Sequence, residues 1–250
     1  MSKIVEVINA SVGYESEIIL RNISISILEN DYIGVVGPNG GGKTTFLKLL
    51  LGQLKPFSGS VQYYVDRGET LFGYLPQVSD VDKRFPISVQ DVVLSGLMSN
   101  KGILNRYKRD DIEKAKDLMR SIGIYNLSSK SIGQLSGGQL QRMFLCRALI
   151  SNPKLLILDE PGTHVDNRFE RDLYELLHEL NKSMGIIMVS HDVGTITSHV
   201  KTIACINRNL NYHLSNKITE EQLAAYDCPI QIITHGRVPH TVLSEHNHDH

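Results

Sequence analysis

The segment "GPNGGGKTT", residues 37–45, constrains the fold of this chain more than any other feature. It fits the pattern GxxxxGK[ST], and it stands between an apolar run, "DYIGVV", and the helical spacing of "KTTFLKLLLG". Glycines let backbone N–H groups curve around a phosphate, and the start of a helix adds partial positive charge. The pattern therefore predicts a phosphate-binding loop for a nucleotide, made of Gly37, Pro38, Asn39, Gly40, Gly41, Gly42, Lys43, Thr44 and Thr45.

Four side chains are expected to carry the chemistry of this site. Lys43 should reach the β- and γ-phosphates, and the hydroxyl of Thr44 should bind Mg²⁺. Farther along the chain, "LLILDEP" ends a run of aliphatic residues at Asp159, and ligands gather at such strand ends in open α/β sheets. Asp159 is the expected Mg²⁺ partner of Thr44, directly or through water. Glu160 is placed to polarise the water that attacks the γ-phosphate.

The order of apolar runs predicts an α/β fold. Short apolar strands alternate with helical patterns at both ends of the chain, which favours a mainly parallel sheet covered on both faces. The first eighty residues are mainly strand-like, and "NISISI" alternates apolar and polar residues as a half-buried strand does. From Pro86 to Ile150 the pattern is helical, as in "DDIEKAKDLMRSIGI", so we expect a helical insertion in the α/β core.

Composition describes an ordinary globular protein. Of the 250 residues, 41% are hydrophobic and 21% charged, and the net charge of −1 gives no general basic surface for nucleic acid. Cys146, Cys205 and Cys228 are too scattered for a disulfide framework or a zinc site. We expect a cytoplasmic chain that does not span a membrane, because no secretion signal and no run of about 18 apolar residues is visible.

A third motif identifies the family that the chain resembles. "LSGGQ", residues 135–139, opens a helix with a serine and two glycines, which is again the construction of an anion-binding helix start. By itself it could equally be a capped helix with flexible glycines. With the phosphate loop before it and "LDE" after it, the sequence resembles the nucleotide-binding subunit of ATP-binding cassette (ABC) transporters over about residues 1–215.

The resemblance implies a P-loop NTPase core with a parallel sheet, an N-terminal antiparallel β subdomain and an inserted α-helical subdomain. We expect a single ATPase domain over residues 1–223. Its catalytic core would comprise 1–85 and 150–215, and its helical subdomain about 86–149. Residues 224–250 would form a C-terminal extension with a histidine-rich tail.

Roles of individual residues follow from the resemblance alone. Tyr14 matches the aromatic residue that stacks on adenine, although by itself it is typical of a turn. Gln77 matches the glutamine that senses Mg²⁺ and the membrane subunit, and Asp166 the aspartate that communicates across a dimer. His191 matches the switch histidine that contacts the γ-phosphate, whereas a lone histidine after a strand is usually structural. The signature that clamps ATP held by a second copy is matched by Ser136, Gly137, Gly138 and Gln139.

One position departs from the family. The stretch "EPGTHVD" has His164 where the family commonly has a small residue, usually glycine. If the backbone needs a positive φ there, histidine is strained, which puts the geometry of this loop in doubt but not the nucleotide site.

The implied mechanism needs ATP, Mg²⁺ and partners. Two ATP molecules would be sandwiched between two copies of the chain, and hydrolysis would let the copies part. The motion would pass to transmembrane permease subunits, through a coupling surface that we expect from Gln77 to about Asn100. A metal-binding substrate-binding protein would take part indirectly, and nucleic acid would not.

Two stretches bear on the cargo. "PQVSDVDKRFPISVQDVVLSG", residues 76–96, and "AAYDCPIQIITHGRVPH", residues 224–240, resemble the zinc and manganese uptake branch of ABC importers. Importers of iron complexes and cobalamin have similar ATPases and stay open as alternatives. So do a non-transport ABC ATPase and a metal-sensing protein with a vestigial ATP site.

The chain ends in "SEHNHDH", residues 244–250. His246, His248 and His250 are imidazoles suited to zinc, nickel or copper, whereas Mg²⁺ prefers oxygen ligands. The catalytic site therefore does not need them. Three interpretations stay open: a solvated end without function, a weak metal-responsive element that binds Zn²⁺, and an artificial addition.

Overall fold

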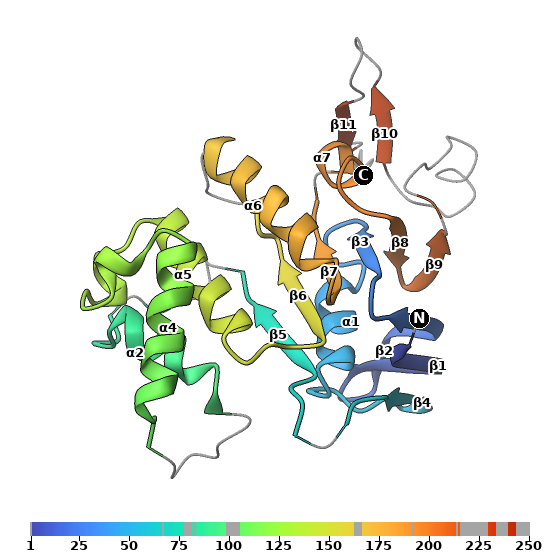
Figure 1. Cartoon of the computed structure of the whole chain (residues 1–250). Helices are drawn as coiled ribbons and strands as arrows, with labels where there is room; N and C mark the ends of the chain where they lie inside the picture. The colour runs from blue at the N-terminus through green and yellow to red at the C-terminus, as the bar shows by residue number, and fades with distance from the viewer. Residues whose placement is uncertain are drawn as a thin grey trace. The chain divides into compact units, whose positions relative to one another are not determined.

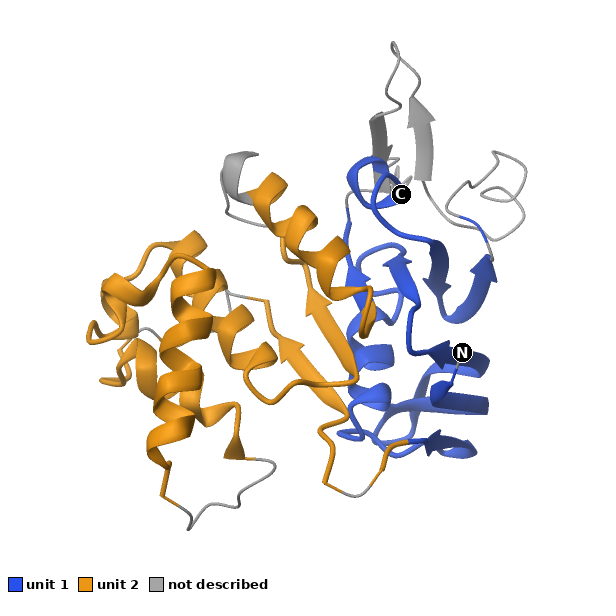
Figure 2. Ribbon diagram, in the orientation of Figure 1, with its two compact units in different colours: residues 1–64, 187–250 blue, residues 65–186 orange. Residues whose placement is uncertain are grey.

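The computed structural model describes residues 2–66, 68–77, 82, 84–98, 106–162, 167–191, 193–213, 215, 230–233 and 240–243 (Figure 1). The chain divides into two compact units, one formed by residues 1–64 with 187–250 and the other by residues 65–186 (Figure 2). Strand β7 (Gly185–Val189) begins in the second unit and ends in the first. The domain boundaries expected from the sequence stay predictions.

The first unit contains an antiparallel sheet of three strands in the order β2-β1-β4. These strands are β1 (Lys3–Tyr14), β2 (Glu17–Leu28) and β4 (Ser58–Tyr63). Burial alternates along β2, where Ile23, Ile25 and Ile27 are buried and the serines between them are exposed. This alternation is the one that "NISISI" predicts, since successive side chains of a strand point to opposite faces.

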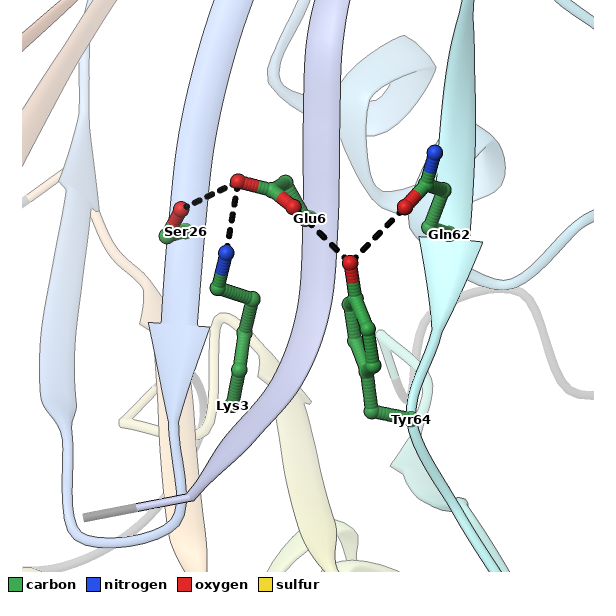
Figure 3. Close-up of polar contacts among 5 residues, drawn as sticks. All are labelled: Lys3, Glu6, Ser26, Gln62 and Tyr64. Atoms are coloured by element: carbon green, nitrogen blue, oxygen red, sulfur yellow. Dashed lines mark hydrogen bonds and ion pairs between the residues drawn. The ribbon is translucent and has the colours of Figure 1, made fainter.

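A polar network joins the strands on the exposed face of this sheet (Figure 3). The Glu6 carboxylate accepts hydrogen bonds from Lys3 Nζ at 2.7 Å and Ser26 Oγ at 3.2 Å. The Tyr64 hydroxyl lies 2.9 Å from the other oxygen of Glu6 and 2.7 Å from Oε1 of Gln62. The hydrogen bond from Lys3, followed by that from Tyr64, lowers the pKa of the Glu6 carboxyl.

A second sheet in the first unit leads into the phosphate loop. Strand β3 (Tyr32–Val36) is buried throughout and pairs in parallel with β8 (Thr202–Asn207), which pairs antiparallel with β9 (Asn209–His213). Helix α1 (Lys43–Leu50) follows the loop. The remaining elements of this unit are α7 (Val193–Thr197), β10 (Ile230–Ile233) and β11 (His240–Leu243), and the last two pair as an antiparallel hairpin.

The second unit combines parallel strands with helices. Strand β5 (Phe72–Leu75) pairs in parallel with β6 (Leu155–Asp159), and Leu75 lies opposite Leu158. Helix α5 packs against α2, α4 and β5. The helical elements of this unit are α2 (Val89–Ser95), α4 (Arg109–Ser121), α5 (Gly137–Leu149), α6 (Asn167–Leu180) and the short 3₁₀ helices η2 (Tyr125–Leu127) and η3 (Ile132–Gln134).

The α/β class with parallel strands is thus confirmed. The helical stripes of the sequence are also in the core, since Ala115 and Met119 of α4 and Leu140 and Met143 of α5 are fully buried. The sequence pattern does not single out strands β1 and β9, because neither alternates regularly: the pairing of β1 has register shifts, and β9 is mostly polar. None of the helices among the described residues combines the length and the apolar composition that a membrane-spanning helix needs.

Candidate nucleotide site

The phosphate loop lies in the first unit, between β3 and α1, as its pattern predicts. Gly37 has φ 152°, and a side chain at this position would collide with the backbone oxygen of Ile206. Gly42 has φ 105°, and a side chain there would collide with Leu20 of β2. The two glycines are therefore needed both for the backbone conformation and for the close approach of the loop to its neighbours.

The start of α1 is open to an anion. Its N-cap is Gly42, and no side chain caps the helix. The first backbone N–H groups of a helix have no partner within the helix, so phosphate oxygens fit them in charge and direction. Thr44 is exposed and Thr45 is buried, so of these two threonines Thr44 can meet a ligand.

Lys43 is held against the loop that it belongs to. Its ammonium donates hydrogen bonds to the carbonyl oxygens of Gly37 at 2.8 Å and Pro38 at 2.9 Å. Only 8% of Lys43 is exposed. A positive charge is thus positioned among the backbone groups of the loop, where a triphosphate would need charge neutralisation.

The backbone next to His191 is hydrogen-bonded to the strand that leads into the phosphate loop. His191 follows β7, and the N–H of the preceding Ser190 donates to the carbonyl of Val35 at 3.1 Å. Val35 is two residues before Gly37. The exposed His191 side chain therefore belongs to the same unit as the phosphate loop, next to the strand that delivers it.

Tyr14 lies at the end of β1, with 40% of its surface exposed. Lys48 of α1 reaches it: the ammonium is 3.3 Å from the Tyr14 hydroxyl and 5.2 Å from the ring centroid. The sequence did not indicate this contact.

The carboxylates lie in the second unit, at the end of β6. Asp159 is 9% exposed, and the hydroxyl of Tyr74 on β5 lies 3.4 Å from its Oδ2. Glu160 has φ 50°, a left-handed conformation that is uncommon for a residue other than glycine. Such strain of about 1–3 kcal/mol is typical of functional positions, where surrounding structure maintains it.

Gln77 contacts Glu160 directly, with its Nε2 donating to Oε2 at 3.3 Å. The parallel register explains the contact. Leu75 is opposite Leu158, so the residues two positions farther along both strands come side by side. Sequence reasoning selected both residues but did not pair them, and it missed Tyr74 entirely. The only signal for Tyr74 was its place in the short strand "FGYL".

The signature motif forms the start of α5 in the second unit. Ser136 is the N-cap, and its Oγ accepts from the Gln139 N–H at 3.3 Å while Gln139 Oε1 accepts from the Ser136 N–H at 3.0 Å. This reciprocal capping box fixes the helix start. Ser136 is exposed, and Gly137 and Gly138 supply the first backbone N–H groups of the helix.

Some predicted residues lie outside the described part of the chain. These are His164, Asp166 and the tail residues His246, His248 and His250. Among the residues that the structure does describe, no three His, Cys, Asp or Glu side chains form a group that could hold a metal ion. Cys146 and Cys205 are buried, and burial raises the pKa of the Cys146 thiol to about 12.

Comparison with known proteins agrees with these motifs. A family profile described as ABC transporter matches residues 20–163. The zinc uptake system ATP-binding protein ZurA of Listeria monocytogenes is 36% identical over 245 residues, which cover 95% of each chain. The manganese transport system ATP-binding protein MntB of Bacillus subtilis is 39% identical over 207 residues, covering 81% of this chain and 83% of that protein.

The fold agrees as well. An ABC transporter assigned to the metal-chelate type, solved in an inward-facing conformation, superimposes with a TM-score of 0.82 at 26% identity, covering 98% of both chains. A nucleotide-free ATP-binding cassette from an ABC transporter matches with a TM-score of 0.72 at 22% identity, over 90% of this chain and 94% of the other.

Proposed function

This chain belongs to the ABC transporter family, and from that premise we propose that it is the ATP-hydrolysing subunit of an importer for a divalent metal ion, zinc or manganese. The observation that carries the cargo assignment is the 36% identity to a zinc uptake ATPase over 95% of the chain. The match to the manganese protein covers less of the chain, 81%. Zinc is therefore the first cargo to test.

Binding of the triphosphate would rest on the loop of the first unit. The uncapped start of α1 and the Lys43 ammonium offer hydrogen bonds and positive charge to phosphate oxygens. Bound Mg²⁺ would neutralise charge that develops on the phosphates. Thr44 and Asp159 are the residues that would hold it, since hydroxyl and carboxylate oxygens are the ligands that this hard ion prefers.

Hydrolysis would rest on Glu160, whose carboxylate accepts a hydrogen bond from Gln77. A carboxylate that is held in place can orient a water molecule and accept its proton. Phosphoryl transfer depends mainly on positioning and charge stabilisation, so His191 and Lys43 would act as stabilising contacts to the γ-phosphate.

The contacts to the other side of the γ-phosphate would come from another copy of the chain. The exposed start of α5, with Ser136, Gly137 and Gly138, has the chemistry to bind the ATP of a partner copy. The resulting motion would act on transmembrane permease subunits, through residues from Gln77 to about Asn100. The chain would then work at the inner face of the cell membrane, with a metal-binding protein delivering the cargo.

ATP hydrolysis by the purified chain tests the enzymatic part of the proposal. The full-length protein should hydrolyse ATP slowly in the presence of Mg²⁺, and Lys43→Ala should lower the rate by about 100-fold, because a charge-stabilising donor is lost. Lys55→Ala is the matched control, since Lys55 is exposed. Turnover that survives in the Lys43 variant would contradict the assignment.

Metal content of cells tests the cargo. Cells that lack this chain should accumulate less zinc or manganese, measured by elemental analysis, and the wild-type chain should restore the metal while Glu160→Gln should not. Normal metal content with loss of iron or cobalamin uptake would favour an iron-complex or cobalamin importer. Restoration by Glu160→Gln would favour a metal-binding protein with a vestigial ATP site.

A further inference from the structure

Lys48 and Tyr14 make a contact that links the antiparallel sheet to α1. The Lys48 ammonium lies 5.2 Å from the centroid of the Tyr14 ring and 3.3 Å from its hydroxyl. The two distances together place the ammonium beyond the hydroxyl end of the ring, where it donates a hydrogen bond to the hydroxyl oxygen. Lys48 thus holds the ring at its hydroxyl end, and with 40% of the residue exposed the ring still offers surface to a planar group.

The backbone fixes where this ring stands. Tyr14 pairs with Glu17 across a turn of two residues, and Glu15 in that turn has φ 52°. A side chain on Gly13 would collide with the backbone oxygen of Glu17, so the two strands approach closely just before the ring. The ring is therefore carried by a tight hairpin end, and Lys48 restricts the freedom that its side chain retains.

The ring also stands near the phosphate loop. Lys48 follows Lys43 by five residues in the same helix, which corresponds to a rise of about 7.5 Å. Leu20 of β2 packs so closely on the loop that a side chain on Gly42 would collide with it. A nucleotide with its phosphates at the start of α1 thus has Tyr14 within the reach of a ribose and a base.

We propose that Lys48 is a positioning residue for the nucleotide base. Its ammonium holds the Tyr14 ring by the hydroxyl and withdraws electron density through it, so that the exposed ring surface stacks more strongly on an electron-rich purine. The inference rests on the proposed function, since it takes Tyr14 as the platform for the base. Stacking on a ring face does not discriminate between purines, so the ligand class is the purine base of a nucleoside triphosphate.

Calorimetry with the full-length protein separates the base from the phosphates. Binding of ATP, GTP and inorganic tripolyphosphate is measured in EDTA, so that no hydrolysis accompanies binding. Lys48→Met keeps the length of the side chain and good helix propensity but removes the charge. This substitution should weaken the binding of ATP and of GTP about two- to fivefold and leave the affinity for tripolyphosphate unchanged.

Three further variants identify the cause. Lys48→Arg keeps a cation and should retain wild-type affinities, whereas Lys55→Met removes one exposed positive charge seven residues farther along the chain and should change nothing. In a Tyr14→Leu background, Lys48→Met should have no further effect on ATP, because the ring through which it acts is gone. Tyr14→Phe keeps the ring but removes the hydroxyl that accepts from Lys48, so the effect of Lys48→Met should be largely lost there as well.

The outcomes distinguish this inference from the proposed function. An unchanged or tighter ATP affinity in Lys48→Met overturns the inference, and a tighter one would mean that Lys48 competes with the base for the ring. If Tyr14→Leu leaves the ratio of ATP to tripolyphosphate affinity unchanged, the base does not stack there and the inference fails, while ATP hydrolysis by the chain still stands. Wild-type protein that binds neither ligand would contradict the proposed function itself.

Discussion

Glu160 shows how a single residue combines strain with catalytic potential. Its φ of 50° is unfavourable for a residue with a Cβ, and its carboxylate accepts the hydrogen bond of Gln77 at 3.3 Å. The left-handed conformation costs an L-residue roughly 1–2 kcal/mol. The chain thus has glutamate at a position where glycine would have no steric penalty, which supports the proposed role of its carboxylate.

This strain predicts an order of stability for two variants that both lack the carboxylate. Glu160→Gly should be more stable than Glu160→Ala by about 1 kcal/mol, because glycine adopts positive φ without a steric penalty. Denaturant unfolding of the two variants measures the difference in their free energies of unfolding. The comparison uses the same dependence of this free energy on denaturant concentration for both variants. Equal stability would mean that the backbone relaxes when the side chain is shortened.

The hydrogen bond from Gln77 predicts a kinetic effect that differs from a binding effect. Gln77→Ala should lower kcat by about tenfold, since Glu160 loses a group that orients it, and should leave the ATP dissociation constant nearly unchanged. Gln62→Ala is a suitable control, because Gln62 belongs to the exposed network of the antiparallel sheet. A rise in the ATP dissociation constant without a change in kcat would contradict the orienting role.

At the scale of elements, the antiparallel sheet is joined by side chains as well as by its backbone. Glu6 of β1 accepts hydrogen bonds from Ser26 of β2 and from Tyr64, which follows β4 (Figure 3). Cross-strand pairs of this kind stabilise a sheet beyond its ladder of backbone bonds. Because this sheet also carries Tyr14 and packs Leu20 against the phosphate loop, its integrity matters for the nucleotide site.

The network predicts a dependence of stability on pH. The pKa of Glu6 is lowered in the folded state, first by the hydrogen bond from Lys3 and then by that from Tyr64. Its contribution is therefore present above the ordinary value of 4.5 and is lost as the pH falls through the lower folded value. Thermal unfolding should show a lower Tm for Glu6→Gln than for wild type near pH 7, and the difference should disappear in acid.

Glu17→Gln is the control for that measurement, since Glu17 is an exposed carboxylate of β2 in the same sheet. Its Tm should follow the wild type at every pH. A Glu6→Gln difference that persists unchanged in acid would assign the effect to packing and not to ionisation.

At the scale of the whole molecule, the chain presents two helix starts that we propose to bind phosphate, and they lie in two different units. The start of α1 has no side-chain cap, whereas the start of α5 is fixed by its own capping box and leaves Ser136 exposed. A helix start that is fixed and exposed is suited to a ligand presented by another molecule. This difference supports an assembly in which two copies share each ATP.

Size-exclusion chromatography tests that assembly. Glu160→Gln with ATP should elute as a dimer, because bound ATP is not consumed, and adding Ser136→Arg should restore the monomer by blocking the helix start. Ser121→Arg is the matched control, since Ser121 is an exposed residue at the end of α4. A monomer under the trapping condition would count against the sandwich.

The C-terminal histidines predict that the full-length chain also binds Zn²⁺, in addition to the Mg²⁺ proposed for the nucleotide site. Zn²⁺ should bind the full-length protein more strongly than a chain ending at Leu243, and binding should weaken as the pH falls through about 6.5, because imidazole ligands must be neutral. Calorimetry of both chains measures the difference, and ATPase rates with Zn²⁺ show whether binding is reported to the site. Equal heats of Zn²⁺ binding for both chains, with ATPase rates that Zn²⁺ does not change, would mean that the tail is a solvated end without function.

The sequence by itself determined the motifs whose function depends on neighbouring residues. The phosphate loop needs glycine, lysine and threonine at fixed spacing between a strand and a helix, and the signature helix needs its capping serine, so both could be located from local pattern. The same holds for Asp159, which an aliphatic run places at a strand end. The α/β class followed from the alternation of such segments.

Only the tertiary structure decided which distant residues meet. Gln77 and Glu160 are 83 positions apart, and the parallel register of β5 and β6 brings them together. Lys48 and Tyr14 are 34 positions apart, and their contact depends on how the β1–β2 hairpin packs against α1. No local propensity encodes a register or a packing direction, since these arise when whole elements bury their apolar faces together. The motifs therefore indicated the chemistry, and the packing of sheet and helix selected the partners of each reactive group.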